Sequence, residues 1–65
     1  MPDLILTPNI QGADDFYAEL LSAHESLSKA ESDALNARLV LVLANHIGDR
    51  AVLSDALTAA ALPKE

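Results

Sequence analysis

The sequence predicts a small all-α protein, a three-helix arrangement with an extended N-terminal arm. Apolar residues recur at helical spacing from about residue 13 onward, and residues that favour helix starts and helix ends separate three such segments. A length of 65 residues allows one small domain. The sequence contains no repeat, low-complexity tract or long linker, so we expect a single helical domain over residues 1–65.

Residues 1–11 are expected to form the extended arm. Two of the three prolines lie in this segment, and a proline disfavours helix both at its own position and at the residue before it. Leu4, Ile5 and Leu6 form the only apolar group outside the predicted helices, so we expect the arm to be an interface element. The alternative is that the arm covers its own helices.

The first helix is predicted over about residues 13–27, directly after Gly12. Asp14 and Asp15 would lie in its first turn, where negative charge interacts favourably with the helix dipole. Two adjacent stripes follow at helical spacing, namely Phe16, Leu20, Ala23 and Leu27, and beside them Tyr17, Leu21 and His24. The apolar face is therefore broad, and we expect the aromatic Tyr17 to take part in an interface.

The second helix is predicted over about residues 29–47. Ser28 and Glu31 have the spacing of a capping box, in which two side chains accept hydrogen bonds from backbone N–H groups at the helix start. Gly48 can adopt the left-handed conformation that ends helices. Residues 39–44 read Leu-Val-Leu-Val-Leu-Ala, which is apolar around most of the helix circumference, so we expect this stretch to be buried.

A third helix is predicted over about residues 50–62, with Asp49 as its N-cap and Pro63 ending the pattern. In an up-down-up arrangement of the three helices, His24 and His46 would lie near opposite ends. The second helix alone would be about 28 Å long, which is too far for the two histidines to share a metal ion. We therefore expect no metal site.

One side of the second helix carries Arg38, Leu41 and Asn45. The first and third helices could cover the two neighbouring stripes, but Leu41 would remain in water between polar residues. A second subunit or a foreign protein could cover it, so we expect these three residues and His46 to belong to an interface. Single exposed leucines are also common on protein surfaces, which is the alternative.

The formal net charge of −6 argues against binding to nucleic acid or to an anionic membrane surface. The chain has no cysteine, so disulfides do not stabilise it. Nothing at the N-terminus has the pattern of a signal peptide, and no apolar run reaches the roughly 20 residues that span a bilayer, so we expect a cytoplasmic protein.

The sequence carries no recognisable catalytic or phosphate-binding constellation, so we expect neither an enzyme nor a cofactor. Glu25-Ser26-Leu27 resembles the Asp-Ser-Leu attachment site of acyl carrier proteins, but over three residues only and without the aspartate. A carrier that uses Ser26, or a small-molecule-binding protein with a pocket between its helices, is the alternative function.

Three segments of the chain carry a wider resemblance: residues 9–17, 35–41 and 43–49, which read Asn-Ile-Gln-Gly-Ala-Asp-Asp-Phe-Tyr, Leu-Asn-Ala-Arg-Leu-Val-Leu and Leu-Ala-Asn-His-Ile-Gly-Asp. They resemble a family of short bacterial proteins catalogued only as a domain of unknown function, over essentially the whole chain. Such proteins are often encoded beside flavin-dependent hydroxylases and other enzymes of aromatic-compound breakdown, which would imply an accessory role. The resemblance implies no activity and no catalytic residues.

These observations predict a non-enzymatic helical interaction module. We expect an accessory subunit or a homo-oligomer that docks on a larger protein, such as an enzyme of aromatic-compound breakdown, or on a second copy of itself. A chain of this length with 51% hydrophobic residues is richer in apolar groups than an isolated minidomain needs, which is the main reason for expecting a protein partner.

Overall fold

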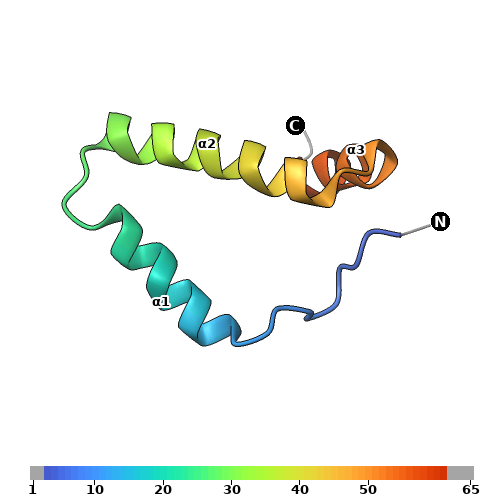
Figure 1. Cartoon of the computed structure of the whole chain (residues 1–65), viewed down its shortest axis with the longest axis horizontal. Helices are drawn as coiled ribbons and strands as arrows, with labels where there is room; N and C mark the ends of the chain where they lie inside the picture. Colours follow the sequence, from blue (N-terminus) through green and yellow to red (C-terminus); the bar gives the residue numbers. More distant parts are fainter. Residues whose placement is uncertain (1–2, 62–65) are drawn as a thin grey trace.

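The computed structural model describes residues 3–61 and confirms an all-α protein with an N-terminal arm (Figure 1). Helix α1 spans Ala13–His24, α2 spans Lys29–Ile47 and α3 spans Arg50–Ala60. Residues 3–11 are non-helical, as the prolines of the N-terminal segment predict. Figure 1 shows it leading away from the start of α1 toward the side of the molecule where α3 lies.

The start of α2 follows the predicted capping box. The backbone N–H of Glu31 donates to the Ser28 hydroxyl at 3.2 Å, and the backbone N–H of Ser28 donates to Glu31 Oε1 at 2.9 Å. The hydrogen bond from the Ser28 N–H favours the ionised carboxylate and is the larger cause that lowers the pKa of Glu31 below its ordinary value of 4.5; the Ser28 side chain is the smaller cause. Local sequence alone therefore determines where α2 begins.

The first helix ends earlier than its apolar spacing predicts. The spacing extends to Leu27, but α1 ends at His24, because Glu25 is extended and Ser26 has a left-handed φ of 68°. The chain has to leave the helix before Ser28 so that this residue can adopt the extended conformation of an N-cap. Leu27 therefore lies in the turn between α1 and α2, where it is half-buried.

The turn between α2 and α3 uses the predicted residues. Gly48 ends α2 with a φ of 74°, a conformation that costs little only without a Cβ atom. Asp49 then accepts a hydrogen bond from the backbone N–H of Val52 at 3.0 Å and caps α3. The third helix ends at Ala60, because Ala61 is extended, and the predicted end at residue 62 lies outside the described residues.

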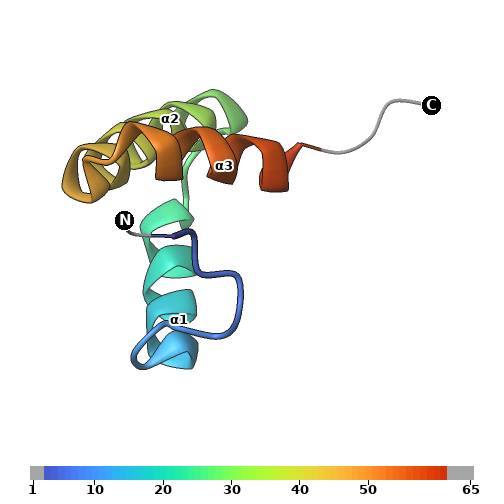
Figure 2. The ribbon, with the colours of Figure 1, turned by 90° about the vertical axis from the view of Figure 1, so that its right-hand side faces the viewer.

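The three helices do not close into a bundle. Figures 1 and 2 show α1 and α2 diverging from their connecting turn, while α3 folds back near the end of α2. The radius of gyration is 13.9 Å, whereas a compact chain of 65 residues has about 11 Å. The up-down-up bundle assumed from the sequence is therefore wrong for the isolated chain, although the helix count and order are as predicted.

The expected burial of the middle of α2 is also wrong for the chain by itself. Within residues 3–61 no side chain reaches full burial, and Leu39 and Ala44 are only half-buried. The four residues between them are exposed by 49–70%: Val40, Leu41, Val42 and Leu43. The pattern correctly identifies an apolar helix, but α1 and α3 are placed so that they cover little of it.

Candidate functional site

The first candidate site is a cleft between α1 and α2. It is lined by side chains from both helices, of which only one is charged: Phe16, Glu19, Leu20, Ala23, Leu35 and Leu39. The helices are tied together near the closed end of this cleft, where His24 Nδ1 and Ser32 Oγ lie 2.9 Å apart in hydrogen-bond geometry. The cleft volume is about 170 Å³, which is below the 300–1,000 Å³ typical of small-molecule sites.

The apolar face of α2 that lines the cleft continues beyond it. At 100° per residue, Val42, Leu43 and His46 lie on the same side of the helix as Leu35 and Leu39. Val42 is 64% exposed and Leu43 is 49% exposed, because α1 has diverged from α2 at this level. We call the residues Leu35, Leu39, Val42, Leu43 and His46 the inner face of α2.

The predicted stripe of Arg38, Leu41 and Asn45 lies beside the inner face: Leu41 is on the far side of α2, and Arg38 and Asn45 are about 100° to 120° around the helix from Leu39. Leu41 is about 200° around the helix from Leu39 and is 70% exposed. Arg38 and Asn45 are exposed beside it. We call these three residues the outer stripe. His46, the other predicted interface residue of this helix, lies on the inner face.

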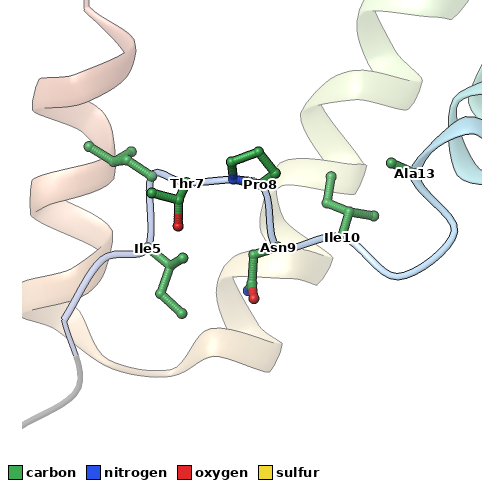
Figure 3. Close-up of a pocket in the computed structure, with 7 residues that line it drawn as sticks. Ile5, Thr7, Pro8, Asn9, Ile10 and Ala13 are labelled. Atoms are coloured by element: carbon green, nitrogen blue, oxygen red, sulfur yellow. The ribbon is translucent and has the colours of Figure 1, made fainter.

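The predicted interface residues of the arm differ in exposure. Leu4 is half-buried, whereas Ile5 is 58% exposed and Leu6 is 76% exposed. Figure 3 shows the arm as an irregular curve that leads into Ala13, with the side chains of Ile5 and Asn9 projecting to the same side. The hollow drawn there is lined by neighbouring residues of one segment and is open to solvent.

Tyr17, the predicted interface residue of α1, is 62% exposed and does not line the cleft. The structure therefore places the predicted interface residues in four separate regions: the arm, α1, the inner face and the outer stripe. Several further exposed apolar residues were not predicted as interface residues, among them Ile10, Phe16, Val42, Leu43 and Leu57. Val42 and Leu43 lie on the two stripes of the second helix that the first and third helices were expected to cover.

The described residues show few features of a metal site, a carrier site or a membrane-spanning helix. Among residues 3–61 no three histidine or carboxylate side chains are grouped as a metal site. Ser26, the residue of the carrier-like tripeptide, is exposed in the turn before α2 rather than at the first turn of a helix. No helix in this part of the chain combines the length and the apolar character needed to cross a lipid bilayer.

Comparisons with known proteins agree with the resemblance noted from the sequence. A sequence profile of the family described as "Protein of unknown function (DUF2783)" matches residues 4–62, which include all three helices. Neither a curated protein nor a solved structure shows significant similarity to the chain. The match extends over nearly the whole sequence, and the chain therefore belongs to the DUF2783 family.

Proposed function

We propose that this protein acts by associating with protein through its helices, as a small accessory subunit rather than as an enzyme. The observation that carries the proposal is that three helices form, α2 and α3 with side-chain N-caps, without any fully buried side chain among residues 3–61. Helices of 11 to 19 residues are marginal in water when nothing packs against their apolar faces. A protein surface that covers those faces would supply the missing packing.

The solvent-accessible surface area shows how much more surface this chain exposes than a compact monomer does. The chain exposes 6021 Å², whereas a compact monomer of this mass exposes about 4,000 Å² and an unfolded one about 10,000 Å². About 2,000 Å² therefore remains uncovered beyond what a compact monomer would leave in water. Much of it is apolar, because twelve large hydrophobic residues are exposed within residues 3–61. Monomeric proteins rarely expose apolar patches of more than a few hundred Å².

The inner face and the outer stripe offer two different kinds of contact. The inner face consists of four aliphatic residues, three leucines and a valine, and one histidine, which suits a dry, packed interface. The outer stripe places Arg38 beside Leu41, and an arginine can pack its stem on an apolar surface while its guanidinium binds carboxylates. The family resemblance adds the expectation that a larger partner is an enzyme of aromatic-compound breakdown.

The experiment that tests the proposal measures association and stability together. Sedimentation velocity and thermal unfolding followed by circular dichroism should be recorded from about 1 to 100 μM protein. We expect either a larger species with a stability that rises with concentration, or a loosely folded monomer without a cooperative transition. A compact monomer that unfolds cooperatively at the same temperature at every concentration would contradict the proposal.

Measuring the intact mass of the protein distinguishes an accessory subunit from the alternative function, a carrier. The intact mass of the protein purified from its native host should equal the mass of the sequence. A covalent prosthetic group that disappears in Ser26→Ala but persists in Ser22→Ala would instead identify a carrier. Both serines are exposed, so the comparison isolates position 26.

A further inference from the structure

We infer that the inner face of α2 and the cleft beside it are the contact surface for a second copy of this chain, packed with its α2 antiparallel to the first. The inference rests on the proposed function, since it names the partner of one of the surfaces described above. Three observations support a second copy as the occupant: the area to be covered, the composition of the inner face, and the charges at the two ends of α2.

The surface area that two chains could bury on association lies in the range of permanent dimers. Two separate chains expose 6021 Å² each, whereas one compact particle of twice the mass would expose about 6,600 Å². Closing two open chains on each other would therefore bury roughly 5,400 Å² in total. Interfaces of obligate homodimers bury about 2,000 to 5,000 Å² or more, and they resemble a protein core divided in two. α1 diverges from α2 (Figures 1 and 2), and Val42 and Leu43 are left 64% and 49% exposed on the inner face.

The inner face is complementary to itself. Leu35, Leu39, Val42 and His46 follow one another at intervals of four, three and four residues, which is the spacing of a seam between two paired helices. No acidic side chain lies on this seam between Leu35 and His46, although Glu19 lines the cleft beside it. Two copies can therefore bring the α2 seams together without placing like charges between them.

The ends of α2 favour the antiparallel orientation. Glu31 lies in the first turn, near the side of the inner face, and the C-terminal turn carries His46. A parallel pair would place two Glu31 carboxylates close together and align the two helix dipoles. An antiparallel pair separates the carboxylates and sets the first turn of each α2, with its partial positive charge, beside the last turn of the other. Leu39 of one copy then lies opposite Val42 of the other, near the two-fold axis.

This arrangement leaves Leu41 of the outer stripe free. Because Leu41 lies about 200° around α2 from Leu39, the second copy does not cover it. The outer stripe could then bind a different protein while the inner face holds the dimer together. Because Leu41 and Leu39 lie on different sides of α2, substitutions at these two positions test the two surfaces separately.

The absence of cysteine from the sequence allows a direct test by single-cysteine cross-linking. Val42→Cys and Leu39→Cys place a thiol near the proposed axis, Leu35→Cys and His46→Cys place one toward its ends, and Ala37→Cys places one on the opposite side of α2. Each full-length variant is first checked for unchanged helix content by circular dichroism. It is then oxidised mildly at low micromolar concentration, and the covalent dimer is measured on a non-reducing gel.

The expected pattern is specific to an antiparallel pair. The two thiols near the axis should link at least roughly tenfold more than Ala37→Cys, because a disulfide requires Cα atoms within about 7 Å. Leu35→Cys and His46→Cys should link poorly to themselves, but they should form the mixed dimer when they are combined. Mass spectrometry of the mixed dimer identifies the pair of residues that is linked.

Other outcomes would overturn the inference. Strong self-linking of Leu35→Cys would indicate a parallel pair, and equal linking of Ala37→Cys would indicate unspecific collision. Sedimentation of the cysteine-free parent separates this inference from the proposed function. A loosely folded monomer that becomes ordered only with a different protein would refute the second copy and leave the proposed function standing, whereas a compact and stable monomer would refute both.

Discussion

His24 and Ser32 form the one side-chain hydrogen bond between two different helices in the described part of the chain. His24 is the last residue of α1, and Ser32 lies in the first turns of α2, with Nδ1 and Oγ separated by 2.9 Å. Both residues are half-buried. Because the two helices otherwise diverge from this point, the hydrogen bond holds the closed end of the cleft.

We expect Ser32→Ala to loosen the connection between α1 and α2. The loss of one partly buried hydrogen bond should lower the free energy of unfolding by about 0.5–1.5 kcal/mol. Urea unfolding followed by circular dichroism measures this change, and Ser22→Ala, at an exposed position in α1, is the control. Equal stability of the two variants would show that the hydrogen bond contributes nothing to the fold.

The capping box should make part of the stability depend on pH. Because the folded-state pKa of Glu31 is lowered, its stabilising effect is complete above the ordinary pKa of 4.5 and is lost as the pH falls through the lowered value. Glu31→Gln keeps an acceptor for the Ser28 N–H but does not titrate there. The stability difference between the parent and this variant should therefore shrink in acid below pH 4.5.

Thermal unfolding of both proteins between neutral and acidic pH measures that difference. Asp55→Asn removes one negative charge from an exposed position in α3, away from the cleft and from the first turn of α2, and reports the general effect of reducing the acidity of the chain. A difference between the parent and Glu31→Gln that stays constant over the whole pH range would contradict the role assigned to the capping box.

Leu39→Ala should reveal whether association buries the inner face. Leu39 is only half-buried in the isolated chain, so its truncation should cost little there. In an assembly that buries it, the cost should reach about 2–5 kcal/mol, as for other core leucines. Unfolding at low and high protein concentration separates the two states. Leu57→Ala, at a residue 74% exposed on α3, is the control, and an equal effect of both variants would place the interface elsewhere.

Deleting residues 1–7 should weaken association if the arm is an interface element. Burial of Ile5 and Leu6 against a partner could contribute roughly 1.5–3 kcal/mol for each side chain before ordering costs. Affinity, measured by sedimentation, and helix content, measured by circular dichroism, should be compared with those of the full chain. Unchanged association together with a loosened fold would show that the arm packs on its own helices. The half-buried side chain of Leu4 is the part of the arm that such packing would involve.

Leu41→Asp and Arg38→Ala should weaken the binding of a larger partner while the helix content stays nearly unchanged. Both side chains project from the outer stripe, which α1 does not cover. Arg38 could instead form only a local surface ion pair, which is usually worth about 0–1 kcal/mol. Partner affinity after capture from the native organism is the measurement. If both variants bind as tightly as the parent, the outer stripe is ordinary solvent-facing surface.

The sequence by itself determined the helices and most of their boundaries. Ser28 with Glu31, Gly48 and Asp49 act through hydrogen bonds and backbone preferences within a few residues, so their effects can be recognised without knowledge of the rest of the chain. The end of α1 was misplaced because the apolar spacing continues through Leu27, whereas the N-cap conformation of Ser28 requires the helix to stop earlier.

Only the tertiary structure decided how the helices lie relative to one another and therefore which apolar residues they cover. The run from Leu39 to Ala44 is apolar on nearly every side, and such a helix has no single face that dictates where α1 should pack. The divergence of α1 and α2 leaves Val42 and Leu43 exposed on the side where a bundle would have buried them. Helix formation depends on neighbouring residues, but burial depends on the arrangement of whole helices, and for this reason the sequence predicted the elements correctly and their packing incorrectly.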